Sequence, residues 1–283
     1  MAAAAGRHAG HRRGGGVLFH AVLAPLTLVW VAPIIFVVLV GLRSFDDLAA
    51  NGLGSLPRSL TLDGFFAAFT EVELGQALFN SILLTAPAVA VSLLLGSMAA
   101  FGLSRYEIPY RKVVLLLMLA GNLLPPQVLL IPVAKMSENI GTYDTILGLV
   151  AIHVGFGLGF YTFVLHGFMR GIPREITEAA IVDGASTAQV YWRVVMPLSR
   201  PALAALAALA TTWIYNDLLW ALTVLQSQAK FPITAALVNL GGSYVTQWNV
   251  VASGALIAAL PTAIVFFAFQ RHFVSGLLVG STK

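Results

Sequence analysis

The 283-residue sequence contains no cysteine and few charged residues. The absence of cysteine excludes disulfides, thiolate metal sites and cysteine nucleophiles. Charged residues make up 10% of the chain, whereas a globular protein has about 25%. Apolar residues make up 58%, and the mean hydropathy is +0.87. This composition excludes a soluble domain, because too few charged side chains remain to cover a core, and it predicts a surface that faces lipid.

Six apolar stretches are long enough to cross a bilayer as helices, since about 20 residues span the roughly 30 Å of hydrocarbon. Strands of a membrane barrel would instead alternate in polarity over about ten residues. We therefore predict an all-α integral membrane protein with six transmembrane helices. In chain order the six stretches are Val17–Val40, Gln76–Leu103, Val113–Ala134, Thr145–Phe168, Pro201–Leu225 and Val250–Gln270.

The distribution of Lys and Arg predicts the orientation in the membrane. Twelve of the 16 cationic residues fall in the segments 1–16, 104–112, 169–200 and 271–283. Cytoplasmic loops retain such cations, so both the N and the C terminus are expected in the cytoplasm. The formal net charge of +4 is then explained by topology and by contact with the lipid bilayer, and no nucleic-acid binding is expected.

The segment 169–200 contains start and stop signals for two short helices. A proline suits the first helical turn, a glycine ends a helix, and a Ser with a Gln three residues later forms a capping box. These signals predict a helix, a glycine turn and a second helix on the cytoplasmic side. In chain order they are Pro173, Gly184, Ser186 with Gln189, and Pro197, which is expected to end the second helix.

The spacing in this segment resembles the EAA loop of permease subunits in ATP-binding cassette importers. That pattern is Glu-Ala-Ala, three residues, Gly, nine residues, Ile, one residue, and Leu-Pro, with Val and Met here in place of Ile and Leu. The residues that carry the resemblance are Glu178, Ala179, Ala180, Asp183, Gly184, Ala185, Val194, Met196 and Pro197. Asn80-Ser81, Leu124-Pro125-Pro126-Gln127 and Tyr215-Asn216-Asp217-Leu218 are similar to stretches of the maltose-type branch, which usually has Trp-Asn-Glu-Phe in the last of these places.

The resemblance implies a type I (MetI-like) importer permease fold whose EAA loop docks into a groove on a separate ATPase. It also implies three kinds of protein partner: a second homologous permease subunit, a cytoplasmic ATPase dimer and an extracytoplasmic sugar-binding protein. The chain itself is expected to have no catalytic residue, no cofactor and no metal, with ATP and Mg on the partner ATPase. Its closing residues, Gly276 to Lys283, lack the Gly-Lys-Ser/Thr order of a phosphate loop. The expected location is the bacterial or archaeal plasma (inner) membrane.

These expectations divide the chain into four parts. Residues 1–16 are expected to be a disordered cytoplasmic tail, and residues 17–75 the first transmembrane helix with an external segment. Residues 76–270 would form the permease core with the EAA loop, and residues 271–283 a cytoplasmic C-terminal tail.

Polar residues in the fifth stretch are candidates for the substrate path. Trp213, Asn216, Asp217 and Trp220 fall at i, i+3, i+4 and i+7, which would place them on one stripe of a continuous helix. A carboxylate inside the membrane costs a few kcal/mol, so Asp217 is a site candidate. Indole faces and polar groups suit a sugar. Alternatively, Asp217 pairs with the second permease subunit or bonds the backbone of a broken helix.

Two further stretches supply polar candidates for the same path. Asn122 and Gln127 flank a Pro-Pro pair that is expected to kink the third span. His153 and Tyr161 share one face of the fourth span. Gly155 and Gly159 form a GxxxG pair, which indicates close helix packing.

Other transport functions remain open alternatives. The same kind of importer could carry a non-sugar solute such as glycerol phosphate, a peptide or an amino acid, although a phosphate would favour Lys or Arg inside the spans, which have none. An ion-coupled secondary transporter would use several intramembrane ionisable groups and an inverted repeat, and a membrane hydrolase would need a nucleophile–base or metal cluster. The sequence does not identify the sugar.

Overall fold

The computed structural model describes residues 11–70, 73–240 and 247–279, and within these ranges the chain forms helices and no strand. The chain divides into two compact units. One unit comprises Met1–Ala68 with Val245–Leu256, and the other comprises Phe69–Tyr244 with Ile257–Lys283. The all-α prediction is confirmed.

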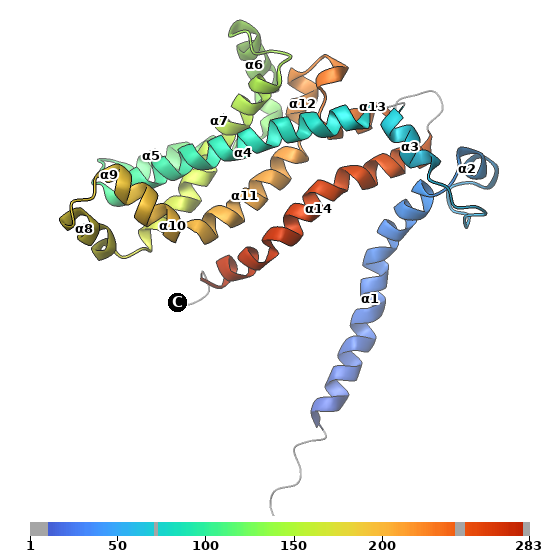
Figure 1. The fold of residues 1–283 in the computed structure, drawn as a ribbon, viewed down its shortest axis with the longest axis horizontal. Helices are drawn as coiled ribbons and strands as arrows, with labels where there is room; N and C mark the ends of the chain where they lie inside the picture. Colours follow the sequence, from blue (N-terminus) through green and yellow to red (C-terminus); the bar gives the residue numbers. More distant parts are fainter. Residues whose placement is uncertain (1–10, 71–72, 241–246, 280–283) are drawn as a thin grey trace, which may run out of the picture. The chain divides into compact units, whose positions relative to one another are not determined.

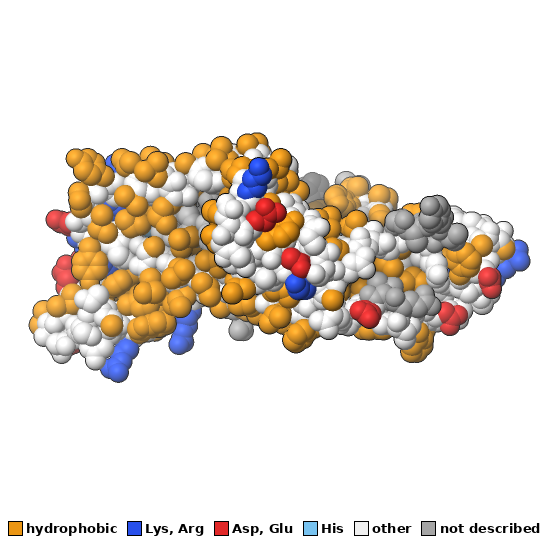
Figure 2. Space-filling model, turned by 90° about the horizontal axis from the view of Figure 1, so that it is seen from above, with side chains coloured by type: hydrophobic (Ala, Val, Ile, Leu, Met, Phe, Trp, Pro, Cys, Tyr) orange, Lys and Arg blue, Asp and Glu red, His pale blue; other side chains and the backbone are white. Residues whose placement is uncertain are grey.

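Four of the described helices are long and apolar enough to cross a membrane. They are α1 (His11–Gly41), α4 (Leu74–Arg105), α7 (Ile146–Arg170) and α14 (Trp248–Val279), and they contain four of the six predicted spans. A fifth span is present if Thr187–Leu198 and Arg200–Tyr215, which are bent by 74°, cross together. Hydrophobic side chains cover much of the face in Figure 2, as expected of a surface that meets lipid.

The third predicted span is not one helix. It is divided between α5 (Arg111–Ala120) and α6 (Pro126–Asn139), with a turn over residues 121–125. Pro125 precedes another proline and has the extended backbone angles φ −58° and ψ 125°. Because a following proline disfavours helical angles, the Pro-Pro pair interrupts the helix where a kink was expected, and the prediction of continuity was wrong.

The fifth predicted span is also interrupted. It forms α11 (Arg200–Tyr215) and α12 (Leu219–Val224), separated by residues 216–218. The chain continues through the short 3₁₀ helix η2 (Gln228–Lys230) into α13 (Ile233–Leu240). The prediction of one continuous helix here was wrong, and the cause lies in tertiary contacts that are described below.

The amino-terminal helix begins earlier than predicted. Helix α1 starts at His11, so residues 11–16 are helical instead of disordered, while residues 1–10 lie outside the described range. Each residue added to an existing helix gains a hydrogen bond without a new nucleation cost, which explains how α1 extends beyond its apolar part. At the other end, α14 continues to Val279.

In the larger unit, α4 packs along α7 and α11 (Figure 1). The approach of α4 to α7 is close at Gly96, where an added Cβ would lie 3.1 Å from the Cβ of Tyr161. Helix α5 meets α7 at Gly159, where an added Cβ would collide with the carbonyl oxygen of Met118. Nothing lies within 4 Å of such an atom at Gly155. Close packing is therefore confirmed for Gly159 but not for Gly155.

The smaller unit is built around a buried arginine. Arg43 is 1% exposed, and its guanidinium donates to Asp47 Oδ2 at 2.6 Å and to Ser55 Oγ at 2.8 Å. The hydrogen bond from Arg43 lowers the pKa of Asp47. This cluster organises α2 (Phe45–Asn51) and the turn before α3 (Asp63–Thr70). Ser253 of α14 donates to the carbonyl of Gly41 at 3.0 Å.

Candidate functional site: the loop between α7 and α11 and the polar groups of the spans

The first helix of the segment 169–200 is α8 (Arg174–Val182), and its end is fixed by a glycine turn. Gly184 has a φ of +86°, a conformation that costs an L-residue energy because of its Cβ. The turn is closed by hydrogen bonds from Gly184 N to Ile181 O and from Ala185 N to Ala180 O, both at 2.9 Å. The predicted glycine stop is confirmed. Pro173 lies one residue earlier than predicted, at the N-cap.

The second helix begins with the predicted capping box. Ser186 N donates to Gln189 Oε1 at 2.8 Å, and Gln189 N donates to Ser186 Oγ at 3.4 Å. The helix then runs through α9 (Thr187–Gln189), the π turn η1 (Val190–Val195) and α10 (Met196–Leu198). Pro197 does not end it, because it lies in the first turn of α10, where a missing N–H is tolerated. The stop predicted at Pro197 was therefore too early.

We call residues 169–200 the coupling loop; it is fixed to α4 by contacts that the sequence did not reveal. The hydroxyls of Tyr191 and Ser97 are hydrogen-bonded at 2.7 Å, and both side chains are buried. The rings of Tyr191 and Phe101 lie 5.3 Å apart. Arg105, the last residue of α4, donates to the carbonyls of Met169 at 2.9 Å and Ile172 at 3.1 Å. No spacing signal connects these residues, since nearly a hundred positions separate Ser97 from Tyr191.

The EAA-motif residues divide between two sides of the coupling loop. Glu178, Ala179 and Asp183 are exposed, as is Gly184. Ala180, Ala185 and Met196 pack against the buried cluster around Tyr191 and Val195, and Val194 and Pro197 are half-buried. The exposed side is also apolar, because Val182 is 87% and Ile181 is 59% exposed. The loop thus has one side attached to its own membrane helices and another side that is exposed.

Asp217 lies at the break between α11 and α12. Its carboxylate accepts the backbone N–H of Ala221 at 3.2 Å and also faces the N–H groups of Leu219 and Trp220. Its carbonyl accepts a hydrogen bond from Thr234 Oγ1 at 2.8 Å. Asp217 therefore satisfies the free donors at the start of α12, as an N-cap residue does. This arrangement corresponds to the alternative in which Asp217 bonds a broken helix backbone.

Three contacts join the residues around this break to α7. His153 Nε2 lies 3.6 Å from Asp217 Oδ2. Trp220 stacks on Phe156 with ring centroids 5.1 Å apart, and Trp213 lies 5.3 Å from Phe160.

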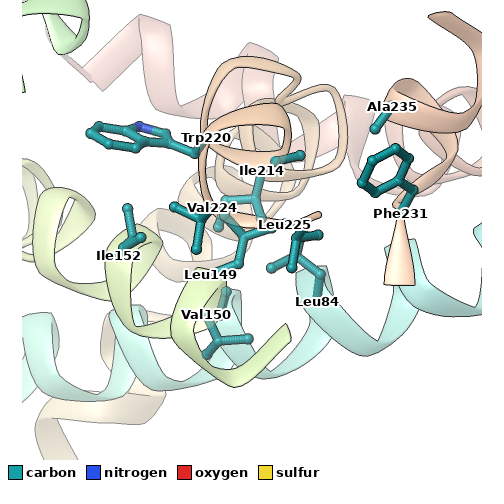
Figure 3. Packing of buried hydrophobic residues seen from close by; sticks show 12 residues of the cluster. Leu84, Leu149, Val150, Ile152, Ile214, Trp220, Val224, Leu225, Phe231 and Ala235 are labelled. Atoms are coloured by element: carbon teal, nitrogen blue, oxygen red, sulfur yellow. The ribbon is translucent and has the colours of Figure 1, made fainter. Parts of the chain in front are cut away.

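The predicted polar stripe does not exist, because the helix is interrupted between its members. Trp213 is 55% exposed, and Asn216 is exposed and donates to the carbonyl of Thr212. Trp220 is instead buried in the hydrophobic cluster beside Ile152 and Val224 (Figure 3). Of the four residues, Asp217 is the one whose polar atoms lie near a polar side chain of α7, at 3.6 Å from His153 Nε2.

The other path candidates are also separated in space. Asn122 lines a cavity of about 330 Å³ between α5, α6 and α7, together with Ser137, Thr142 and Phe156. Gln127 is exposed in the first turn of α6. Tyr161 is 2% exposed and belongs to the core between α4 and α7. The structure thus places Asn122 at a cavity and Tyr161 in the core.

The connection from α12 to α13 is held by a second set of polar contacts. Asn80 Nδ2 donates to the carbonyls of Ala229 at 2.8 Å and Phe231 at 3.1 Å, and Ser81 Oγ accepts from Ile233 N at 2.8 Å. The Asn80-Ser81 pair of the sequence motif therefore holds the chain that leads from α12 into α13.

Asp144, next to the start of α7, binds the same connection. Its carboxylate accepts from Lys230 Nζ at 2.7 Å and from Ser227 Oγ at 2.6 Å. The hydrogen bond from Lys230, followed by that from Ser227, holds the pKa of Asp144 far below its usual range. Within the described residues, no group of three or more His, Asp and Glu side chains could hold a metal ion.

Comparison with known proteins gives consistent matches. This chain is 36% identical to an alpha-glucoside transport system permease protein (AglG) of Rhizobium meliloti over 80% of its own length, and it spans 61% of that relative. It is 31% identical to an osmoprotective compounds uptake permease protein (GgtD) of Synechocystis sp., covering 93% of this chain and 91% of that relative.

A solved bacterial ABC transporter involved in the import of the acidic polysaccharide alginate shares the fold. Its chain aligns with a TM-score of 0.80 and 22% identity, covering 95% of this chain and 100% of that chain. Residues 92–279, more than half of the sequence, match the family model of binding-protein-dependent transport system inner membrane components. The chain therefore belongs to the family of binding-protein-dependent transport system inner membrane components.

Proposed function

We propose that this chain is the transmembrane permease subunit of an ATP-driven importer of a mono-, di- or oligosaccharide, coupled to a separate ATPase through the coupling loop. The observation that carries this proposal is the two-sided loop. Glu178, Ala179 and Asp183 are exposed, while Tyr191 fixes the opposite side to α4. A partner that binds the exposed side would act on membrane helices that it does not itself contact.

Short, firm connections support transmission of a movement. Helix α8 begins four residues after the end of α7, and Ser199 alone separates α10 from α11. The bonds of Arg105 and Tyr191 resist slippage of the loop along α4. A displaced loop would therefore move α4, α7 and α11 together, and alternating access generally uses such rigid-body movement.

In this proposal the coupling loop and both termini are cytoplasmic. The partners are a second homologous permease, a cytoplasmic ATPase dimer that holds ATP and Mg, and an extracytoplasmic sugar-binding protein, and this chain supplies no catalytic residue. The positive-inside distribution of Lys and Arg supports the orientation, and the family description supports a binding protein. Reporter fusions within residues 169–200 test the orientation, which an external reporter would contradict.

A sugar is supported by the description of the Rhizobium relative as an alpha-glucoside permease. The cavity beside Asn122 agrees with it, because Ser137 and Thr142 add polar groups to a wall that includes Phe156. A small polar osmolyte is the second candidate, favoured by the description of the Synechocystis relative. Uptake of labelled disaccharides, glycerol phosphate, dipeptides and amino acids by the complete transporter distinguishes these substrates.

The coupling role is tested in proteoliposomes that contain the complete transporter. Glu178→Lys reverses a charge on the exposed side, and Gly184→Pro cannot adopt the positive φ of the turn. Both variants are expected to lose most uptake while ATP hydrolysis continues and the chain still inserts. Glu138→Lys, an equal charge change on the exposed part of α6, serves as the control. Normal uptake by both loop variants would refute docking at this loop.

A further inference from the structure

A basic hollow of about 560 Å³ lies beside the coupling loop, where the turn between α4 and α5 meets the start of α8. Three of its lining residues are cations, namely Arg111, Lys112 and Arg174, and one is an acid, Glu107. The remaining lining residues are Ile108, Pro109 and Tyr110. Cations from α5 and from α8 thus surround one space, although more than sixty positions separate them in the sequence.

The positive charge of the hollow is compensated only in part, because Glu107 is the one acid among its lining residues. The ion pairs of the described chain join Arg43 to Asp47, His153 to Asp217 and Lys230 to Asp144. None of the three cations of the hollow is therefore paired with Glu107 or with another carboxylate. Arg111 donates only a long hydrogen bond of 3.5 Å, to the carbonyl of Leu103. Arg174 also repels the nearby Arg105. Three cations and one acid around a single space favour a bound anion.

The position of the hollow indicates where that anion comes from. Helix α5 exposes apolar side chains directly after the hollow, at Val113, Leu116 and Leu117, the last of which is 69% exposed. The cations therefore lie about one helical turn from a surface that suits lipid chains. Lipid headgroups lie at the border of the hydrocarbon region, and anionic headgroups attract clustered Lys and Arg.

We propose that the basic hollow binds the phosphate of an anionic lipid headgroup and thereby connects α5 to the coupling loop through Arg174. The ligand chemistry is a phosphate ester or a free phosphate held by two guanidinium groups and an ammonium group. Under the proposed function the coupling loop is cytoplasmic, so this lipid would lie in the cytoplasmic leaflet. Only that assignment rests on the proposed function. The contact would make the position of α8 sensitive to the lipid composition around it.

The test measures lipid retention by the purified full-length chain in detergent. The chain is incubated with equal amounts of phosphatidylglycerol and phosphatidylcholine, and the bound lipid is counted by native mass spectrometry. Phosphatidylglycerol is expected to be retained preferentially. The double variant Arg111→Gln/Lys112→Gln should bind it more weakly, by about fivefold for each cation removed. Arg193→Gln, which removes an exposed cation outside the hollow, is the matched control and should bind normally.

Two further measurements distinguish the sources of the phosphate. Labelled inorganic phosphate that binds the lipid-free chain, and is lost in the double variant, identifies a free phosphate as the ligand and contradicts the lipid assignment. Equal retention of phosphatidylglycerol by the double variant and the control, without phosphate binding, overturns the site altogether. Circular dichroism and the elution volume establish that the variants are folded.

These binding measurements need no ATPase and no uptake assay. Failure of the proposed transport function would therefore leave their outcome unchanged, and the two ideas can fail separately.

Discussion

The coupling loop and the interrupted fifth stretch differ in how they obtain their geometry. In both regions, spacing along the sequence predicted which residues would share a side of a helix. The loop forms the predicted helix, glycine turn and helix, with Gly184 and the Ser186–Gln189 box in their expected roles. The stretch from Trp213 to Trp220 breaks in the middle, and its polar residues point to different places.

The difference reflects the range of the interactions that act on each region. Signals in the loop operate between residues at most a few positions apart, so the spacing contains them. At the break, Thr234 donates to the Asp217 carbonyl from 17 residues away, and His153 and Phe156 belong to α7. Periodicity therefore predicts a helix reliably only where no distant partner competes for its backbone.

The largest expected effect is a loss of stability at the contact between α5 and α7. The GxxxG pair supplies both the test position and its control. Gly159→Ala places a Cβ against the backbone carbonyl of Met118, and overpacking of this kind costs about 1–3 kcal/mol. Gly155→Ala meets nothing within 4 Å and should be neutral. Thermal unfolding in detergent measures both variants. Equal stability of the two would show that α5 does not depend on close packing with α7.

A smaller effect is expected at the break itself. Asp217→Ala removes the carboxylate that accepts from the first turn of α12; loss of such a cap costs about 0.5–2 kcal/mol and should impair uptake without preventing assembly. Asp217→Asn keeps an acceptor oxygen and should retain most of the stability and uptake. If uptake is lost in both variants while stability is kept in the Asn variant, the negative charge itself serves the substrate or a partner. Transport by the Ala variant at the normal rate would leave Asp217 with a structural role alone.

Removing the hydrogen bond that attaches the coupling loop to α4 should have a milder effect. Tyr191→Phe removes one hydroxyl from its bond to Ser97, and such a bond contributes about 0.5–1.5 kcal/mol. Each single change leaves the hydroxyl of the other residue buried without its partner. Ser97→Ala combined with Tyr191→Phe should therefore be less harmful than the sum of the single changes. A double-mutant cycle on the ratio of uptake to ATP hydrolysis measures this. Strict additivity would mean that the hydroxyl pair does not contribute to coupling.

The smallest effect is a pH dependence at the contacts of Asp144. The folded state lowers the pKa of Asp144, so its bonds to Lys230 and Ser227 stabilise the fold fully above the unfolded value of about 3.9. This stabilisation should decline as the pH falls below about 4. Asp144→Asn should flatten that decline in melting experiments, whereas Glu138→Gln, an exposed acid on α6, should not. Parallel acid profiles for wild type and Asp144→Asn would contradict the assignment.

Interruption of the third span could be foreseen in part, because Pro125-Pro126 removes donors and restricts the preceding residue whatever surrounds it. That the kink would be a full turn between α5 and α6 could not be foreseen. The division of the EAA-motif residues into attached and exposed sides was likewise hidden, because it depends on Tyr191 reaching Ser97 on α4.

The sequence by itself determined that this protein is helical, lies in a membrane and has two short helices, separated by a glycine turn, in residues 169–200. Composition, length of apolar runs and short-range capping act within one stretch of chain, so they are visible without a fold. Only the tertiary structure decided that Asp217 caps α12, that Trp220 is core, and that cations from α5 and α8 share one hollow. These features depend on which distant segments meet, and helical periodicity does not encode the packing of one helix against another.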